Sequence, residues 1–382
     1  MPRSRRIVVI APDSFKGSLA APDVCAAIGR GITRAWPDAE LRARPMADGG
    51  EGTLDAVLAA VGQAGTRRFA RVAGAHGATV DAGYGMVAGG VAVVEVAQAV
   101  GITDAAAMAI PVVERDTSGV GQLLSTLLDS GARRIMIGLG GSSTNDGGAG
   151  LLAALGLRLL DASGHPVRPT PTGLAALARI DATALDARIG QVEITIMSDV
   201  NNALTGARGA TAIFGPQKGV TPAQVAPIDA TLARFASLAE AALGRRAADN
   251  PGAGAAGGLG FALQLLGGEF RSGAEVVAGL IGLDAALDDA VWAITGEGRS
   301  DAQTLLRKAP FVVAERARAH DVPISLLSGA IDATALTELN VAFDGCFALP
   351  AGPTTLDACI DGAALLLADR AEAMARLFSA QS

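Results

Sequence analysis

Short apolar runs that end in polar, glycine-rich loops recur along the chain, and stretches with helical periodicity lie between them. Residues 7–11 are apolar and rich in β-branched side chains, which predicts a buried parallel strand. Val24, Ile28 and Ile32 then mark one face of a predicted helix over 21–35. By the same criteria we predict strands at 41–44, 134–139, 192–197, 291–295 and 324–328, and helices at 54–61, 149–155, 221–243, 311–320 and 356–378. This alternation of strands and helices is typical of an α/β fold.

A segment with a period of two interrupts this pattern. Alternating apolar positions from Thr66 to Ala97, separated by glycine-rich turns, predict an antiparallel meander. The change of period near 62–66 indicates one domain boundary, and the polar break at 244–251 indicates a second. The 382 residues are enough for two domains. We therefore predict one α/β domain built from 1–64 and 252–382, and a second α/β domain, 65–251, inserted between them.

Composition and charge exclude several classes of protein. Half of the residues are apolar and 18% are charged, which excludes intrinsic disorder. The net charge is −7 and basic runs are short, so neither nucleic acid nor an anionic membrane is an expected partner. Cys25, Cys346 and Cys359 lack the spacing of a disulfide framework or a zinc site. Apolar runs are too short for a secretion signal or a membrane span, so we expect a cytoplasmic protein.

Lysine is rare in this chain. Of the 31 basic residues, only Lys16, Lys218 and Lys308 are lysine, and each lies in a glycine- or proline-rich loop. An ammonium group is a compact, strongly hydrated charge, whereas arginine offers a planar fork. A lysine retained where arginine is the default suggests contact with an anion in a narrow space.

Several predicted strands end in loops that combine glycine, hydroxyl and carboxylate groups. The richest is 140–148, whose backbone amides could form an anion-binding nest and whose Asp146 could hold a cation that bridges phosphates. Taken singly, the carboxylates of the other loops would be helix caps or turn residues. Together with Lys16 they supply what phosphoryl transfer needs, namely charge neutralisation, Mg²⁺ ligation and a proton acceptor. Neither a Walker A motif nor a readable Ser-His-Asp arrangement is present in the sequence.

Seven loop stretches, in this order, resemble the bacterial glycerate kinases of the type I family over almost the whole chain. They are APDSFKGS (11–18), PMADGGEGT (45–53), GLGGSSTNDGGAG (138–150), SDVNNALTG (198–206), FGPQKG (214–219), GAGAAGGLG (252–260) and ITGEGRSDAQT (294–304). The sequence departs from the family pattern at Ala203, where the family usually has proline, and at Arg307, where it usually has glycine.

The resemblance implies phosphorylation of D-glycerate by ATP with Mg²⁺, usually at the 2-hydroxyl, in the cytoplasmic breakdown of glyoxylate, glycerate or aldarates. It also implies two α/β domains, one flavodoxin-like with a parallel sheet and assembled from both chain ends, the other an inserted mixed α/β domain. We assign Lys16 to the transferring phosphate, and Asp48, Asp199 and Asp301, unranked, to proton acceptance or Mg²⁺ binding. The candidate metal ligands are Asp146, Asp199 and Glu297. The candidate substrate- and phosphate-binding residues are Asp13, Ser14, Ser18, Gly49, Gly50, Glu51, Gly140, Gly141, Ser142, Thr144, Asn145, Lys218, Gly257, Gly258, Gly296, Glu297, Gly298, Arg299 and Lys308.

Two alternatives stay open at this point. One is a kinase that phosphorylates a related small hydroxy acid such as tartronate, or that forms 3-phosphoglycerate. The other is a phosphate- or ligand-binding α/β protein without turnover. A homodimer is the expected assembly, because two-fold dimers are the commonest oligomers and the meander could supply an apolar surface.

Overall fold

The structure, a computed structural model, describes residues 6–379 and divides the chain into two units. The first unit contains the residues up to Asp48, Gly52–Gly62, and the part from Ser272 onward. The second contains Gly49–Glu51 and Gln63–Arg271.

The sheet of the first unit is made from both ends of the chain. Its strands are β1 (Ile7–Ile10), β2 (Glu40–Ala43), β11 (Trp292–Thr295), β13 (Ile324–Ser328) and β15 (Gly345–Ala348). They pair in the order β15-β13-β11-β1-β2, and each pairing is parallel. Numbered along this unit, the order is 2-1-3-4-5, which is the flavodoxin-like arrangement. The predicted fold class is confirmed.

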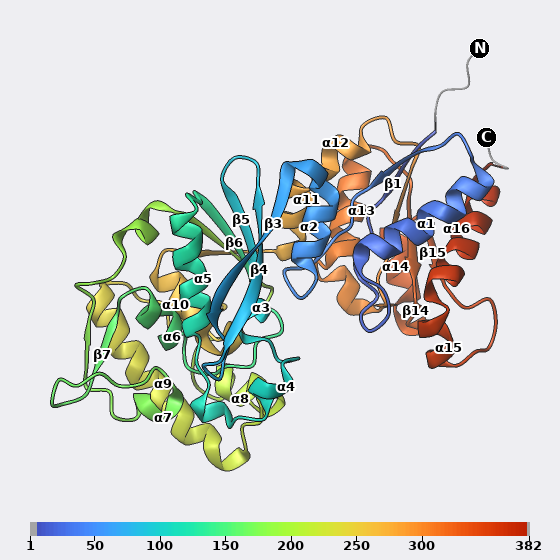
Figure 1. Cartoon of the computed structure of the whole chain (residues 1–382). Coiled ribbons are helices and arrows are strands. Elements are labelled where there is room, and N and C mark those ends of the chain that lie inside the picture. The colour runs from blue at the N-terminus through green and yellow to red at the C-terminus, as the bar shows by residue number, and fades with distance from the viewer. Residues whose placement is uncertain (1–5, 380–382) are drawn as a thin grey trace. The chain divides into compact units, whose positions relative to one another are not determined.

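The helices α1 (Ala21–Ala35) and α16 (Ala363–Ser379) pack side by side in this unit, as Figure 1 shows. Val8 of β1 is buried with both helices in one hydrophobic cluster. Gly31 allows their close approach, because a Cβ atom there would lie 2.0 Å from the carbonyl oxygen of Ala368. The other helices of the unit are α2 (Thr53–Val61), α11 (Gly273–Leu280), α12 (Leu283–Leu287), α13 (Ala309–Ala319), α14 (Leu336–Ala342) and α15 (Leu356–Asp361).

The helix predicted over 356–378 is divided in two. Gly362 lies between the end of α15 and the start of α16. Its N–H still donates to the carbonyl of Ala358 at 3.0 Å, so the chain does not turn away abruptly. Glycine is nevertheless a poor helix former, and regular helix stops there. The short helix α15 is therefore a separate element.

The sheet of the second unit is mixed. Its strands are β3 (Gly65–Ala73), β4 (Thr79–Val87), β5 (Val91–Glu95), β6 (Arg134–Gly138), β9 (Glu193–Met197) and β10 (Glu269–Arg271), in the order β10-β9-β6-β5-β4-β3. The predicted meander is confirmed, since β3, β4 and β5 pair antiparallel. The strands from β5 to β10 pair in parallel.

The second boundary differs from the predicted one. The prediction has the chain return to the first domain at 252, whereas the structure has it return at Ser272. The reason is that β10 pairs with β9 and helix α10 (Leu259–Leu265) packs in the core of the second unit. A strand of three residues with two charged side chains carries no apolar run, so the sequence pattern did not indicate it.

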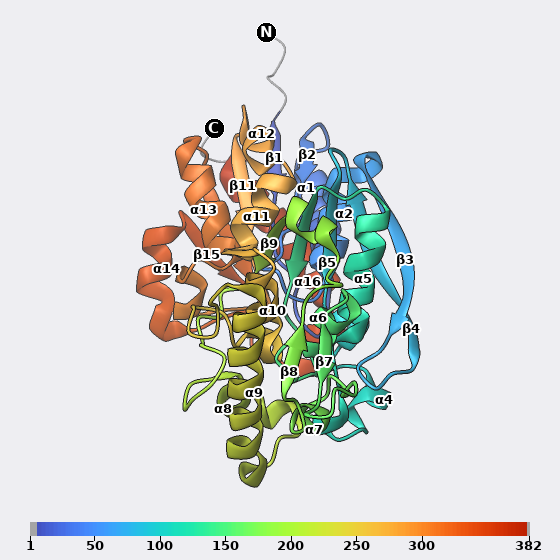
Figure 2. The same ribbon diagram turned by 90° about the vertical axis from the view of Figure 1, so that its left-hand side faces the viewer.

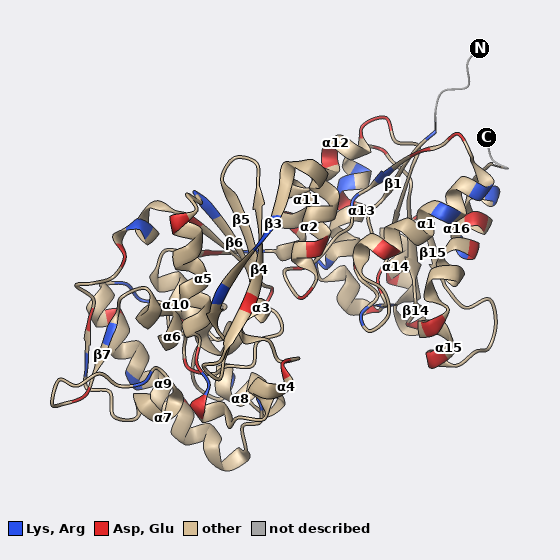
Figure 3. Cartoon of the chain, viewed as in Figure 1, with Lys and Arg blue, Asp and Glu red and all other residues tan. Residues whose placement is uncertain are grey.

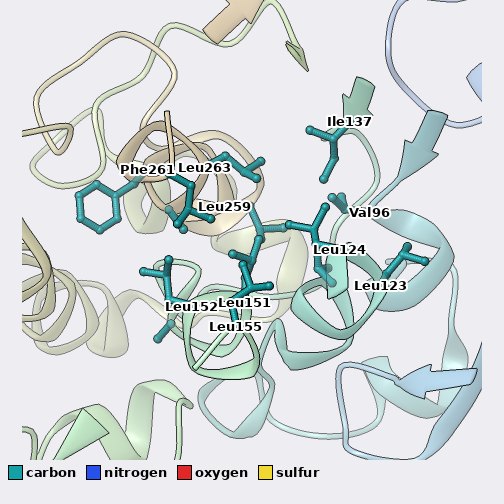
Figure 4. Packing of buried hydrophobic residues seen from close by; sticks show 14 of the residues in the cluster. Val96, Leu123, Leu124, Ile137, Leu151, Leu152, Leu155, Leu259, Phe261 and Leu263 are labelled. Atoms are coloured by element: carbon teal, nitrogen blue, oxygen red, sulfur yellow. The ribbon is translucent and has the colours of Figure 1, made fainter. Parts of the chain in front are cut away.

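The core of the second unit is built from leucines on several helices, as Figure 4 shows for α5 (Ser118–Asp129), α6 (Ala149–Ala154) and α10. The predicted helices over 149–155 and 221–243 correspond to α6 and α9 (Pro222–Leu243) and are confirmed. Figure 2 shows α9 near the strand pair β7 (Arg158–Leu160) and β8 (Arg179–Asp181). The remaining helices are α3 (Ala97–Val100), α4 (Ala105–Met108), α7 (Pro171–Leu174) and α8 (Ala210–Phe214).

The apolar face of the meander is already used within the chain. Ala70 and Val72 of β3 are buried in the same cluster as the leucines of α5. The edge strand β3 also carries exposed arginines, and charges on an edge strand oppose pairing with another sheet. Figure 3 shows acidic and basic residues interspersed along both units. The homodimer therefore stays a prediction. None of the helices within residues 6–379 is long and apolar enough to cross a membrane.

The contact at Gly31 leads to a stability prediction. We expect Gly31→Ala to lower the free energy of unfolding by about 1–3 kcal/mol, because the new methyl group would overlap a backbone carbonyl of α16. The matched control is Gly279→Ala in α11, where a Cβ meets no atom within 4 Å. It should raise stability by up to about 1 kcal/mol through helix propensity. Urea unfolding of both variants measures the difference, and equal effects would contradict the packing argument.

Candidate active site

A cavity of about 670 Å³ lies at the carboxyl ends of the strands in the first unit. Its lining comes from the loops that follow β1, β2, β11, β13 and β15. In sheets of this order, ligands bind beyond the strand ends at the switch point, here between β1 and β11. Nine of the predicted site residues line the cavity: Asp13, Ser14, Lys16, Ser18, Asp48, Glu297, Gly298, Arg299 and Lys308.

Asp13 is the most strongly perturbed carboxylate of this cavity. Burial raises its pKa, the negative charges of Asp48 and Glu297 raise it further, and the result is a pKa of about 7. The backbone N–H of Ser14, which donates to Asp13 Oδ1 at 2.6 Å, and the ammonium of Lys16 act in the opposite direction. A carboxylate with a pKa near neutrality can take up a proton at physiological pH. The sequence analysis had placed Asp13 only among the binding residues.

Lys16 reaches into the cavity from the loop after β1. Its Nζ lies 3.8 Å from Asp48 Oδ2, and its side chain is 75% exposed. An exposed ion pair of this kind is weak, about 0–1 kcal/mol, so the ammonium can exchange Asp48 for an anionic ligand at little cost. Gly17 has a φ of +80°, which favours glycine, and a Cβ there would meet no atom within 4 Å.

Glu297 and Asp301 follow the same strand, but the structure gives them different surroundings. Glu297 lines the cavity, and its Oε1 accepts hydrogen bonds from Ser300 Oγ at 3.1 Å and Thr304 Oγ1 at 2.6 Å. Burial is the main cause that raises the pKa of Glu297. Asp301 instead caps the 3₁₀ turn Ala302–Leu305, accepting the N–H of Gln303 at 2.8 Å, and is not part of the cavity lining. Asp301 thus serves as the cap of this turn, and its catalytic role stays a prediction.

Lys308 lines the cavity at the residue before α13, and Arg299 lines it next to Gly298. Arg299 also pairs with Asp332 at 3.0 Å. Arg307 has a φ of +61°, a left-handed conformation that costs a non-glycine residue about 1–2 kcal/mol. The glycine usual in the family at this position is thus explained by backbone conformation.

Gly296 does not line the cavity: a Cβ there would lie 1.8 Å from the carbonyl oxygen of Leu327, so this glycine serves close packing of the strand ends.

The loop 140–148 of the second unit lies mostly in the interior. Ser142, Thr144 and Asn145 are buried, and the Asn145 amide donates to Thr211 Oγ1 at 3.0 Å. Lys218 is also buried, and its ammonium donates to Ser142 Oγ at 3.0 Å and to the Thr144 carbonyl at 2.8 Å. Burial lowers the pKa of Lys218 to about 7. Lys218 thus holds this loop in place, and its contact with a phosphate stays a prediction.

Asp146 has a structural role in this structure, and metal ligation by its carboxylate stays a prediction. Its carboxylate is fully buried and accepts hydrogen bonds from the N–H and Oγ1 of Thr117 and from the N–H groups of Gly148 and Gly150, at 2.7–3.1 Å. These bonds join the start of α5 to the start of α6. Burial is the main cause that raises the pKa of Asp146 to about 6.

Several glycines among the predicted binding residues lie close to other parts of the chain. A Cβ at Gly257 would lie 2.1 Å from the Thr144 carbonyl oxygen, and one at Gly258 would lie 2.4 Å from the Cα of Gly147. The same holds in the second unit for Gly49, packed on Met197, and for Gly140, packed on Gly50. Gly141, Glu51 and Asp199 are exposed, and none of them is in the lining of the cavity.

Apart from Phe15, which lies after β1, the residues of the cavity that sequence reasoning missed lie after β13 and β15. They are Gly329, Ala330 and a run of mostly apolar residues between Leu349 and Ala363. The rule that ligands bind beyond strand ends could have indicated them, but β15 was not predicted. Among residues 6–379 no group of three or more His, Cys, Asp or Glu side chains is arranged to hold a metal ion by itself.

The first unit is a flavodoxin-like α/β domain with a charged cavity at its switch point, and comparisons with known proteins identify the family. Residues 8–379 match the model of the Glycerate kinase family. The chain is 41% identical to glycerate kinase of Bacillus subtilis (strain 168), over 94% of each chain. It is 40% identical to glycerate 2-kinase of Escherichia coli (strain K12), over 93% of each chain. The crystal structure of a Salmonella typhimurium LT2 protein, provisionally named glycerate kinase 2, matches 99% of each chain with a TM-score of 0.87 and 39% identity.

The chain belongs to the glycerate kinase family. The resemblance found in the loop motifs is confirmed, and the protein is a kinase.

The surroundings of Asp146 lead to a second prediction. We expect Asp146→Asn to lower the free energy of unfolding by about 2–4 kcal/mol, because an amide group cannot accept all the N–H and O–H donors that the buried carboxylate accepts. Added Mg²⁺ should not change the melting temperature of either protein. The control is Glu193→Gln, an exposed carboxylate on β9. If Asp146→Asn melts at the wild-type temperature but needs more Mg²⁺ for activity, Asp146 is a metal ligand and the structural argument is wrong.

Proposed function

We propose that the protein transfers the γ-phosphoryl group of ATP to the 2-hydroxyl of D-glycerate, forming 2-phosphoglycerate and ADP. The observation that carries this proposal is the cavity at the switch point, where Lys16, Lys308 and carboxylates from separate loops line one space. The name of the Escherichia coli relative, glycerate 2-kinase, supports transfer to the 2-position. A kinase that consumes ATP works where ATP is made available, so we propose the cytoplasm as its compartment.

The positive charges of the cavity suit the phosphates. Phosphoryl transfer is catalysed mainly by positioning and by neutralising the charge on the transferring oxygens. Lys16 is exposed in the cavity on a glycine-containing turn, and Lys308 lines the cavity from the start of α13. We assign Lys16 to the γ-phosphate and Lys308, with Arg299, to the other phosphate oxygens.

Asp13 suits the role of proton acceptor. As the 2-hydroxyl oxygen forms its bond to the γ-phosphorus, the bond from that phosphorus to the bridging oxygen breaks and ADP leaves. The hydroxyl proton goes to the Asp13 carboxylate. Asp13 lines the same cavity as both lysines, and its N–H donates to the carbonyl of Gly296 at 2.8 Å, which fixes its backbone beside the end of β11. This assignment adds Asp13 to Asp48, Asp199 and Asp301, the carboxylates that sequence reasoning considered.

Asp48 and Glu297 have the chemistry that Mg²⁺ requires. Both carboxylates line the cavity, and the charge of each raises the pKa of Asp13, so a cation beside them would relieve repulsion. Mg²⁺ usually binds one or two carboxylates, with substrate phosphates and water completing its shell. When bound, it would neutralise charge on the β- and γ-phosphate oxygens. Asp48 and Glu297 are the residues that we propose to hold it.

The product can be tested directly. With ATP, Mg²⁺ and D-glycerate, we expect ADP formation that depends on glycerate. Enolase added without phosphoglycerate mutase should then yield phosphoenolpyruvate, because enolase uses only the 2-phosphate. Phosphoenolpyruvate that forms only when the mutase is present would show 3-phosphoglycerate instead. The same assay with tartronate tests the related-acid alternative, and no turnover with any acid would leave a binding protein.

The buried Asp13 leads to a pH prediction. Its pKa is raised from 3.8 to about 7 in the folded protein, so its contribution to stability is fully present below pH 4 and is lost as the pH rises through 7. Without Mg²⁺ and ATP, Asp13→Asn should therefore melt at a higher temperature than the wild type at pH 8, with the difference shrinking toward pH 4. Its turnover should fall about 10²–10⁴-fold, the usual worth of a general base. Unchanged turnover would remove Asp13 from the mechanism.

A further inference from the structure

The cavity of the first unit has a wall that the proposed phosphoryl transfer does not use. It follows β15 and is formed by the loop from Leu349 to Thr355, by α15 and by the first residue of α16, and α15 is drawn in red at the lower right of Figure 1. Its apolar members are Leu349, Pro350, Pro353, Leu356, Ile360 and Ala363. We call these six residues the aliphatic wall.

Three members of the aliphatic wall are exposed, namely Pro353, Leu356 and Ile360. Leu356 is 75% exposed and Ile360 is 37% exposed. They are four residues apart on α15, so their side chains lie on one face of the helix, and both line the cavity. Apolar surface left in contact with water is unfavourable, and a ligand that covers it gains binding free energy.

The aliphatic wall is joined to the charged part of the cavity. Ser18 Oγ donates a hydrogen bond to the carbonyl of Ile360 at 3.0 Å. Ser18 belongs to the same loop as Lys16, which pairs with Asp48. A ligand that fills the cavity therefore contacts charged groups at one part and aliphatic side chains at another. The hydroxyl of Ser18, which also lines the cavity, connects these two parts.

D-Glycerate by itself neither fills this cavity nor accounts for its aliphatic wall. It is a three-carbon acid with a carboxylate and two hydroxyl groups, so it has no apolar face to lay against leucine and proline. It is also far smaller than a space of about 670 Å³. A nucleoside triphosphate does match, because it carries several negative charges at one end and a flat, weakly polar base at the other.

We propose that the aliphatic wall is the nucleobase subsite. The base of the nucleoside triphosphate packs against Leu356, Ile360 and Pro353, and its triphosphate extends toward Lys16 and Lys308. This inference rests on the proposed kinase function of the same cavity. It goes beyond that function by assigning the binding of the base to a segment in which no catalytic residue lies.

The first test compares two exposed leucines. Leu356→Ser should weaken the binding of ADP about tenfold and raise the KM for ATP by a similar factor, through loss of apolar contact with the base. Binding of inorganic tripolyphosphate and the KM for D-glycerate should not change. The matched control is Leu365→Ser, at a leucine of α16 that is 61% exposed and outside the cavity lining. It should behave as the wild type in every measurement.

The second test uses a thiol that is already present in the wild-type protein. Cys359 and Cys346 are both half-buried, but Cys359 lies on α15 and lines the cavity, whereas Cys346 does not. ADP should slow the alkylation of Cys359 by iodoacetamide, and inorganic tripolyphosphate should not. The rate at Cys346, followed by peptide mass spectrometry in the same sample, is the internal control.

The outcomes separate this inference from the proposed function. If the wild type phosphorylates glycerate but Leu356→Ser keeps the wild-type KM for ATP and ADP leaves Cys359 unprotected, the base binds elsewhere and the subsite is wrong. If the wild type neither binds ADP nor turns over, both proposals fail. Weakened ADP binding in Leu356→Ser alone, with ADP protection of Cys359, supports the subsite whichever acid accepts the phosphate.

Discussion

The parallel pairing of β1 with β11 is the interaction on which the candidate site depends. It joins Val8 to Trp292 and Ile10 to Ile294, segments from opposite ends of the chain. The ladder continues beyond the strands, because Ala11 N–H donates to Ile294 O and Asp13 N–H donates to Gly296 O, both at 2.8 Å. The register of two strands thus fixes the backbone of Asp13 beside that of Glu297. The second unit lies between β1 and β11 in the sequence. Hydrogen bonds hold these two strands side by side, so the loops at their ends meet although they are far apart along the chain.

This register has an electrostatic cost. It places Asp13 in a buried position near two other carboxylates, and burial together with their charges raises its pKa to about 7. Desolvating like charges opposes folding, so the surrounding sheet must hold them in place. Buried side chains of β1 and β11, such as Val9 and Ala293, lie in the centre of that sheet. The hydrogen-bonded interior of the sheet thus holds a carboxylate with a raised pKa at the carboxyl end of β1.

The sequence predicted the two-unit α/β organisation and the charged residues of the cavity, because both depend on local signals. Apolar runs such as 7–11 indicate strands, and polar loops at their ends indicate sites. The role of the glycines could not be predicted in the same way. Gly257 and Gly298 occur in similar motifs, but the first packs on the Thr144 carbonyl and the second lines the cavity. Whether a glycine makes room for ligand or for backbone depends on tertiary contacts, which one sequence does not contain.

The role of a lysine likewise cannot be predicted from its charge alone. The three rare lysines lie in different surroundings, since Lys16 and Lys308 line the cavity and Lys218 is buried. An ammonium can satisfy two oxygen acceptors in a small interior space, as Lys218 does with Ser142 and Thr144. A guanidinium is larger and carries more donors, each of which would need a partner there. The property that makes lysine suitable for a phosphate, a compact charge, therefore also makes it suitable for clamping a buried loop. Only burial distinguishes the two uses, and burial is decided by the fold.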